Sequence, residues 1–174
     1  MTADRKYVFD WDAIIGDMTT ARKKLGPLTR VEVYRLFQFT LRDILEQQFG
    51  TAKTDELFRE AGVLAGRSFF RRFCSEATSV GELVKTLQDK FKEFGIGILR
   101  LEKSDLENMT FTVTVDEDLD CSGMQDSHDV ICVYDEGLIQ GILQEFTGKG
   151  FDVREVDCWC TGERTCRFTA NLKP

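Results

Sequence analysis

The sequence lacks the features that mark several large classes of protein. It has no run of about twenty apolar residues, the length that a helix needs to cross a bilayer. Its first residues lack the apolar segment of a secretory signal. Lys and Arg number 23 against 30 Asp and Glu, and the resulting net charge of -7 gives no basic field to attract phosphates. We therefore expect a cytoplasmic protein that binds neither membranes nor nucleic acid.

Recognisable catalytic motifs are also scarce. The sequence has no glycine-rich dinucleotide fingerprint and no acid/base pair with an evident partner. Its single histidine, His128, lies with Cys121 in an acidic stretch over residues 116–129. Either side chain could donate a proton, but a lone loop histidine is more often solvated. We therefore predict no catalytic residue.

The domain organisation follows from length and from the absence of linkers. A chain of 174 residues can bury the core of one ordinary domain, and no repeat or low-complexity tract divides it. Gly26-Pro27 would stop a helix, because proline cannot continue one. We predict a single domain over residues 1–174, with an N-terminal helical arm over 1–27 and a core over 28–174.

Hydrophobic periodicity predicts the elements of this core. Apolar residues at three and four residue spacings predict helices over 29–49 and 54–73, the second with Leu64 facing inward. Ser79 and Glu82 form a capping box that would start a helix ending before Gly95. Strands are predicted over 96–103 and 109–115, a helix over 130–146, and a hairpin over 151–159 and 165–172. This order predicts an α+β fold, with an antiparallel sheet packed against several helices.

Two glycines stand on nearly the same face of the helix over 54–73. Gly62 and Gly66 each cost roughly 1 kcal/mol relative to alanine at such positions. A cost of this kind indicates the close approach of another helix or of a bound ligand. We favour helix packing.

The cysteines give the sharpest chemical signal. Six cysteines without a secretion signal indicate metal ligation or burial in a reducing compartment. Cys132 opens a predicted helix, while Glu155, Cys158 and Cys166 lie on the two arms of the predicted hairpin. Four such ligands could make a closed tetrahedral zinc site.

The spacing alone leaves alternatives open. An iron–sulfur cluster or scattered core cysteines would also fit, and Cys160 could replace Cys158. Glu155 and Cys158 have opposite parity, so they share a face only if the strand bulges or turns between them. We predict that Cys74 and Cys121 stand apart from this cluster as ordinary residues.

A family resemblance rests on the last third of the chain. The runs Cys132-x-Tyr-Asp-Glu-Gly137-x3-Gly141, Thr147-Gly-Lys and Glu155-x2-Cys158-x3-Gly162-x3-Cys166-x-Phe168 resemble the C-terminal signature of the 4-vinyl-reductase-like, or hydrocarbon-binding, domain family. The resemblance extends over most of the chain from about Leu28. The family is named from a protein implicated in reducing a vinyl group on chlorophyll precursors. It also supplies the aromatic-effector sensing domains of phenol- and xylene-responsive activators.

This resemblance implies a fold, a metal and a pocket. The fold would be similar to transport-particle subunits and haem-type nitric oxide sensors, with a zinc-bearing helix and β-hairpin at its C-terminal end. The zinc would be structural and bound by Cys132, Glu155, Cys158 and Cys166. A hydrophobic ligand would lie between helices and sheet, and ordinary core packing competes with this role for each candidate lining residue. These candidates are aromatic: Phe69, Phe73, Phe91, Phe94, Phe111, Tyr134 and Trp159.

The function that we expect is sensing of a small hydrophobic or aromatic molecule, such as a tetrapyrrole. Relatives imply a homodimer through the N-terminal helices and a downstream signalling protein that receives the output. Two alternatives remain open. One is a tetrapyrrole vinyl reductase or its accessory protein, and the other is an assembly subunit with no ligand.

Overall fold

The computed structural model describes residues 6–173, and the chain divides into two compact units with a boundary between Gln38 and Phe39. The first unit holds two short helices, α1 (Trp11–Ile15) and α2 (Met18–Ala21). Asp10 and Asp17 cap them by accepting backbone hydrogen bonds. The short helices expected in this segment are confirmed. The division into an arm and a core after residue 27 stays a prediction.

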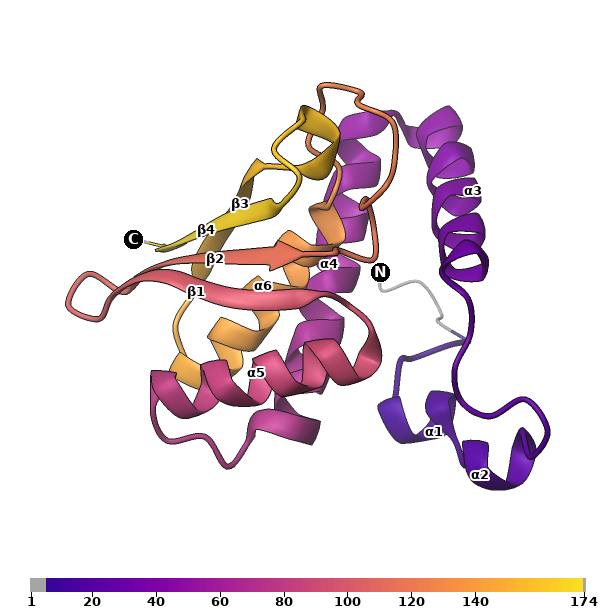
Figure 1. Cartoon of the computed structure of the whole chain (residues 1–174), viewed down its shortest axis with the longest axis horizontal. Helices are drawn as coiled ribbons and strands as arrows, with labels where there is room; N and C mark the ends of the chain where they lie inside the picture. The colour runs from indigo at the N-terminus through magenta and orange to yellow at the C-terminus, as the bar shows by residue number, and fades with distance from the viewer. Residues whose placement is uncertain (1–5, 174) are drawn as a thin grey trace. The chain divides into compact units, whose positions relative to one another are not determined.

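The helix α3 (Val31–Phe49) crosses the boundary, and the second unit contains the remaining elements. Its four strands form one antiparallel sheet in the order β1-β2-β4-β3 (Figure 1). The predicted α+β class is therefore confirmed, with element ends that differ by a few residues. The elements are α4 (Thr51–Phe69) with a π-helical turn (Phe70–Cys74), α5 (Val80–Phe94), β1 (Ile98–Asp105), β2 (Thr110–Asp116), α6 (Val133–Thr147), β3 (Phe151–Asp157), a 3-10 turn (Trp159–Thr161) and β4 (Cys166–Leu172).

The signals that bound α5 act nearly as predicted. Ser79 is its N-cap, and the Ser79 hydroxyl accepts a hydrogen bond from the Glu82 backbone N–H at 3.3 Å. The Glu82 carboxylate accepts from the backbone N–H of Thr78 at 2.8 Å, so the reciprocal bond falls one residue earlier than in the usual capping box. Gly95 ends the helix in the left-handed conformation, with φ of 66°.

The helix α6 is the centre of the second unit. It lies between the sheet and α4 in Figure 1, and it contacts both α4 and β3. Every residue from Gly137 to Leu143 is buried, as expected for a helix that is covered on opposite faces. Anything that holds α6 therefore holds the core.

Glycines allow α4 and α6 to cross with their backbones in contact. A Cβ atom on Gly62 would lie 2.1 Å from the Tyr134 carbonyl oxygen, and one on Gly137 would lie 2.2 Å from the Arg59 carbonyl oxygen. The preference for helix packing at Gly62 is thus confirmed. The inward placement of Leu64 is wrong, since its side chain is 48% exposed. The reason is that the glycine face of α4, and not its leucine face, meets α6.

No helix within residues 6–173 is both long enough and apolar enough to cross a membrane.

Candidate metal centre and apolar cavity

Four buried cysteine sulfurs gather in the second unit. The Sγ atoms of Cys121, Cys132, Cys158 and Cys166 all lie within 4.8 Å of one another, and all four residues are fully buried. The Cys132 sulfur is 3.9 Å from that of Cys158 and 3.8 Å from that of Cys166. Zinc–sulfur bonds of about 2.3 Å place the sulfurs of a tetrahedral site about 3.8 Å apart. The cluster therefore has the dimensions of a zinc–thiolate site.

Local structure positions three of these sulfurs where the sequence indicated. Cys132 is the N-cap residue of α6, Cys158 follows β3, and Cys166 opens β4. The pairing of β3 with β4 shifts register between Glu155 and Asp157. This irregularity confirms the predicted bulge, which is needed to turn Cys158 toward the face that Glu155 occupies.

The fourth sulfur belongs to Cys121, and the prediction that this residue stands apart is wrong. Its Sγ atom lies 3.1 Å from that of Cys166. The reason is the order of the sheet, because β2 pairs with β4 and sets Val115 opposite Cys166. The chain that leaves β2 turns back beside the start of β4. The sequence showed two separate pairs of strands, and the juxtaposition appears only when they join in one sheet.

Glu155 lies beside the cluster but outside this set of four sulfurs. Its Oε2 atom accepts a hydrogen bond from the Cys132 backbone N–H at 2.9 Å. Its Oε1 atom is buried and has no hydrogen-bond partner among the described residues. Burial, followed by the charge of Cys158, raises the pKa of Glu155 to about 9. An orphaned carboxylate oxygen beside four sulfurs fits a site that receives a cation.

The sulfurs and nearby carboxylates perturb one another. Hydrogen bonds from Cys121, Cys132 and Cys166 lower the pKa of Cys158, so its sulfur is the favoured thiolate of the group. Asp118 Oδ1 accepts weak hydrogen bonds from the sulfurs of Cys121 at 3.7 Å and Cys132 at 3.9 Å. Burial, followed by the charge of Asp120, raises the pKa of Asp118 to about 7. Buried donors of this density are typical of a metal centre.

A charged network supports the cluster from behind. The Arg59 guanidinium of α4 donates to Glu136 Oε2 of α6 at 2.9 Å. Glu136 Oε1 accepts from the backbone N–H of Glu155 at 2.9 Å, and Glu155 in turn accepts from Cys132. These bonds join α4, α6 and β3 at the end of the molecule where the sulfurs meet.

The two remaining cysteines lie outside the cluster. Cys160 is buried, but its sulfur does not belong to the group of four, and its carbonyl oxygen accepts from the backbone N–H groups of Ser127 and His128. Cys74 ends the π-helical turn after α4, and burial raises the pKa of its thiol to about 11. Cys74 is an ordinary core residue.

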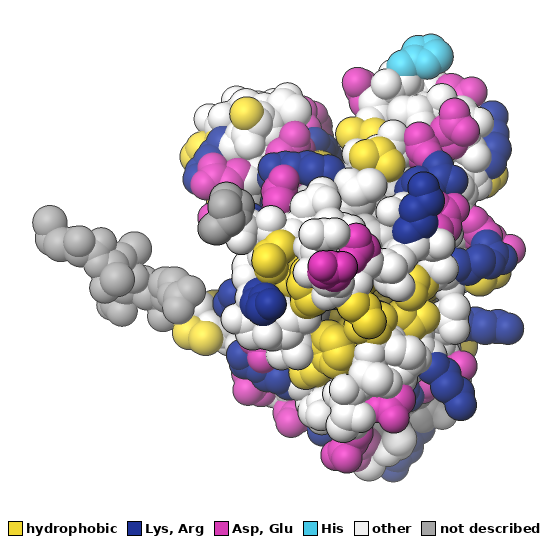
Figure 2. All heavy atoms as spheres, turned by 90° about the vertical axis from the view of Figure 1, so that its left-hand side faces the viewer, with side chains coloured by type: hydrophobic (Ala, Val, Ile, Leu, Met, Phe, Trp, Pro, Cys, Tyr) yellow, Lys and Arg dark blue, Asp and Glu magenta, His cyan; other side chains and the backbone are white. Residues whose placement is uncertain are grey.

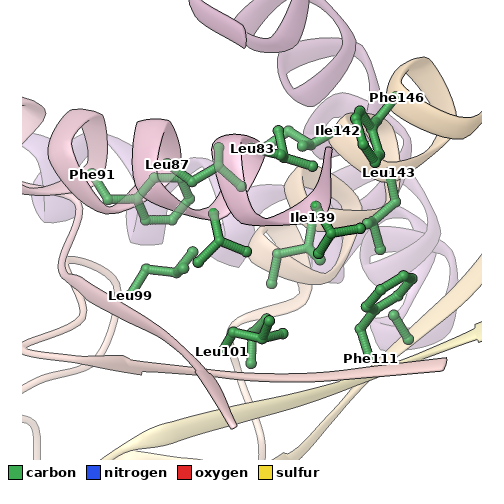
Figure 3. A pocket seen from close by; sticks show the side chains of 14 residues that line it. Leu83, Leu87, Phe91, Leu99, Leu101, Phe111, Ile139, Ile142, Leu143 and Phe146 are labelled. Carbon is green, nitrogen blue, oxygen red and sulfur yellow. The ribbon is translucent and has the colours of Figure 1, made fainter. Parts of the chain in front are cut away.

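A separate apolar cavity lies between α5, α6 and the sheet. Its volume is about 40 Å³, and side chains from α5, β1, β2 and α6 point toward one another around it (Figure 3). Every lining residue is apolar, so the walls offer no hydrogen-bonding side chain. The lining residues are Val80, Leu83, Val84, Leu87, Phe91, Leu99, Leu101, Phe111, Val113, Ile139, Ile142, Leu143, Phe146 and Ala170.

The predicted pocket residues divide between this cavity and other places. Phe91 and Phe111 line it, whereas the other five predicted residues do not belong to its lining. Three of these five form an aromatic cluster with Phe91, in which Phe69 stacks edge-on against Phe73 and Phe94 at centroid distances of 5.0 and 6.0 Å.

The last two predicted pocket residues lie near the cysteines in sequence. Tyr134 is in the first turn of α6, where its carbonyl oxygen meets Gly62. The indole N–H of Trp159 donates to the Met124 carbonyl oxygen at 3.1 Å. The aliphatic lining, contributed largely by α5 and α6, is what the aromatic search missed. Its signal was the leucine spacing of α5.

The cavity and the sulfur cluster share two elements. Cys132 caps α6 and Ile139 of the same helix lines the cavity, roughly 10 Å farther along the axis. Cys166 opens β4, and Ala170 of the same strand reaches the cavity. Figure 2 shows hydrophobic side chains gathered near the centre of the face that bears the β1–β2 turn. A displacement of α6 or β4 would therefore be felt at both places.

Solved structures share this fold at low sequence identity. A vinyl-4-reductase family protein from Methanocaldococcus jannaschii is 16% identical with a TM-score of 0.64, covering 98% of this chain and 99% of that one. The phenol-responsive sensory domain of the transcription activator PoxR, solved with phenol, is 17% identical with a TM-score of 0.64 over 83% of this chain and 75% of that one.

The predicted transport-particle and haem-sensor likeness is confirmed as well. A trafficking protein particle complex subunit 3 from Naegleria fowleri, covalently bound to palmitic acid, is 13% identical with a TM-score of 0.62. It covers 83% of this chain and 95% of that one. An H-NOX protein from S. oneidensis is 15% identical with a TM-score of 0.52, over 79% of this chain and 74% of that one.

Sequence comparison points the same way. An uncharacterized protein of Methanocaldococcus jannaschii is 23% identical over 88 residues, which span 51% of this chain and 52% of that protein. The chain thus aligns with about half the length of this curated relative. Residues 111–172, which include all four clustered cysteines, match the model of the vinyl-4-reductase domain family. This segment therefore belongs to the vinyl-4-reductase domain family, and the family resemblance seen in the sequence is confirmed.

Proposed function

We propose that this protein binds a small hydrophobic molecule in the cavity between α5, α6 and the sheet, and that a structural zinc ion clamps the adjoining end of the domain. The observation that carries the proposal is the entirely apolar lining of the cavity. Ligand sites are typically concave and largely apolar. The likeness to a phenol-responsive sensory domain supports a sensing role.

The size of the cavity indicates how a ligand enters. Its volume is about 40 Å³, whereas an apolar cavity known to hold benzene measures about 150 Å³. An aromatic ring or an acyl chain therefore enters only when lining side chains move. The helix α5 supplies five of the fourteen lining residues and packs on β1, so it is the natural cover to shift. Binding would then change the position of α5 relative to the sheet.

The zinc clamp rests on the sulfur cluster and on the resemblance. Cys132, Cys158 and Cys166 would tie the start of α6 to β3 and β4, with Glu155 as the fourth ligand that the resemblance implies. A closed shell of protein ligands would leave no open coordination position for catalysis. The ion would hold α6 and β4 in place, and both elements reach the cavity.

The lining favours binding over vinyl reduction. None of its side chains can donate or accept a proton, and reduction of a vinyl group needs a proton donor near the substrate. Release of the signal would go to a homodimer partner or to a downstream protein, in the cytoplasm that the sequence predicts.

Calorimetric titration with two named probes tests the proposal. Phenol and palmitate are chosen because solved neighbours hold phenol and palmitic acid. We expect at least one probe to bind and to raise the unfolding temperature, since a ligand at a hundred times its Kd stabilises the folded state by about 2.7 kcal/mol.

A cavity-filling variant locates the binding. Ala170→Val adds two methyl groups within the cavity and should abolish probe binding while the fold is kept. Val156→Ala, on the exposed side of β3, serves as the control and should bind as the wild type does. Equal binding by Ala170→Val, or no response to either probe, would remove the cavity as the ligand site.

A further inference from the structure

Five donors compete for four positions at the proposed zinc site. The residues Cys132, Cys158 and Cys166 belong both to the sulfur cluster and to the set that the resemblance implies. The fourth position can be filled by Glu155 or by Cys121, since a structural zinc ion takes four protein ligands. The geometry distinguishes between them.

Cys121 is the donor that already shares the cluster. Its sulfur is within 4.8 Å of the other three sulfurs, and its side chain is completely buried. The four sulfur atoms surround one common point, as the ligands of a tetrahedral ion do. The 3.1 Å between the sulfurs of Cys121 and Cys166 needs to open by less than 1 Å to reach the edge of about 3.8 Å of a zinc–thiolate tetrahedron.

Glu155 is already committed to another task. Its Oε2 atom accepts the N–H of Cys132, and its own N–H is bound to Glu136. These bonds fix the backbone at the N-cap of α6, from which the Cys132 sulfur projects. Carboxylates that orient metal ligands through such hydrogen bonds are a common feature of metal sites.

The turn after β2 holds Cys121 in place. The Ser122 backbone N–H donates to the Asp118 carbonyl oxygen at 3.0 Å, and the Met124 N–H donates to the Cys121 carbonyl oxygen at 3.0 Å. The Leu119 N–H bonds to the Ile96 carbonyl oxygen at 2.9 Å, which ties the turn to the residue before β1. Cys121 therefore sits on an ordered turn that offers its sulfur to the cluster.

From this arrangement, we propose that zinc is held by four thiolates, with Cys121 as the fourth ligand and Glu155 as a positioning residue for Cys132. The inference rests on the zinc clamp proposed above and changes its extent. The ion would join four segments instead of three, because it also fastens the turn after β2. The acidic segment over residues 117–131 would then be anchored at both ends, by Cys121 and by Cys132.

X-ray absorption at the zinc edge of the wild-type protein tests the ligand set without any substitution. We expect four sulfur scatterers at about 2.3 Å and no oxygen scatterer at about 2.0 Å. Three sulfurs with one oxygen would overturn the assignment of Cys121 and leave the clamp in place. Purified chain that holds no zinc after incubation with the ion under reducing conditions would overturn the clamp and the inference together.

Cobalt substitution assigns the ligands by residue. The thiolate-to-cobalt charge-transfer absorption of Cys121→Ser should fall by about a quarter, because one of four thiolates is lost. Glu155→Gln should keep the wild-type absorption, since the amide oxygen can still accept the N–H of Cys132. Cys160→Ser is the matched control, a buried cysteine outside the cluster. Full absorption in Cys121→Ser together with altered absorption in Glu155→Gln would overturn the inference.

Discussion

Glu136 is the residue on which three elements converge. Its side chain is 5% exposed, and it accepts hydrogen bonds from Arg59 of α4 and from the Glu155 backbone of β3. A second arginine, Arg154, lies farther away, with 3.6 Å between its nitrogen and the same Glu136 oxygen. A buried carboxylate is stable only when such partners remain.

Removing Arg59 should therefore be costly. We expect Arg59→Met to lower the free energy of unfolding by about 3 kcal/mol, because Glu136 would keep a buried charge without its nearer partner. Urea denaturation at neutral pH measures this loss. Arg71→Met is the control, since Arg71 pairs with Glu145 on the exposed surface and its removal should change little. Equal effects of the two substitutions would contradict the role given to Glu136.

At this scale the sequence predicted the site in part. Cys132, Cys158 and Cys166 were identified from their places on a helix and a hairpin, and the bulge after Glu155 followed from strand parity. Cys121 was missed because its neighbourhood depends on the pairing of β2 with β4, a contact between segments about fifty residues apart. Spacing along the chain carries no information on such a pairing.

Among the elements, the crossing of α4 and α6 sets the architecture. Gly62 and Gly66 of α4 face Gly137 and Gly141 of α6, and each lacks room for a side chain. The cost of these glycines in a helix indicated a close neighbour, but the identity of the neighbour could not be read from periodicity. The same limit explains Leu64, which lies on the apolar stripe of α4 and yet is half exposed.

A single methyl group tests the crossing. Gly62→Ala should destabilise the fold by about 2 kcal/mol or more, because the new Cβ would meet the Tyr134 carbonyl oxygen at 2.1 Å. Gly81→Ala, in the exposed first turn of α5 with no atom near its Cβ, should instead stabilise by about 0.5–1 kcal/mol. Opposite shifts of the urea midpoint are the expected result. A neutral Gly62→Ala would show that the two helices are not in backbone contact.

The whole molecule carries an apolar surface on α3 that suits the expected homodimer. Leu41, Ile44 and Phe49 are 42%, 49% and 55% exposed on this helix. Exposed apolar stripes of this kind commonly mark protein interfaces. The overall α+β class, the antiparallel sheet and the element order were predicted from periodicity and capping, whereas the use of each exposed face was not.

Light scattering after size-exclusion chromatography tests the dimer. We expect the wild type to elute as a dimer and Ile44→Lys to elute as a monomer, because a charge would be buried in the interface. Asp43→Lys introduces the same side chain one residue away, off the apolar stripe, and should remain dimeric. A monomeric wild type at micromolar concentration would rule the interface out.

Native mass spectrometry after gentle purification tests most directly the claim that this domain is a zinc-clamped receptor for a hydrophobic molecule. The account predicts a mass equal to the chain plus one zinc ion, with a small apolar molecule bound in addition. In Ala170→Val the zinc should remain and the apolar molecule should be lost, since only the cavity is filled. A chain that carries no zinc, or an apolar ligand held equally by Ala170→Val, would contradict the account.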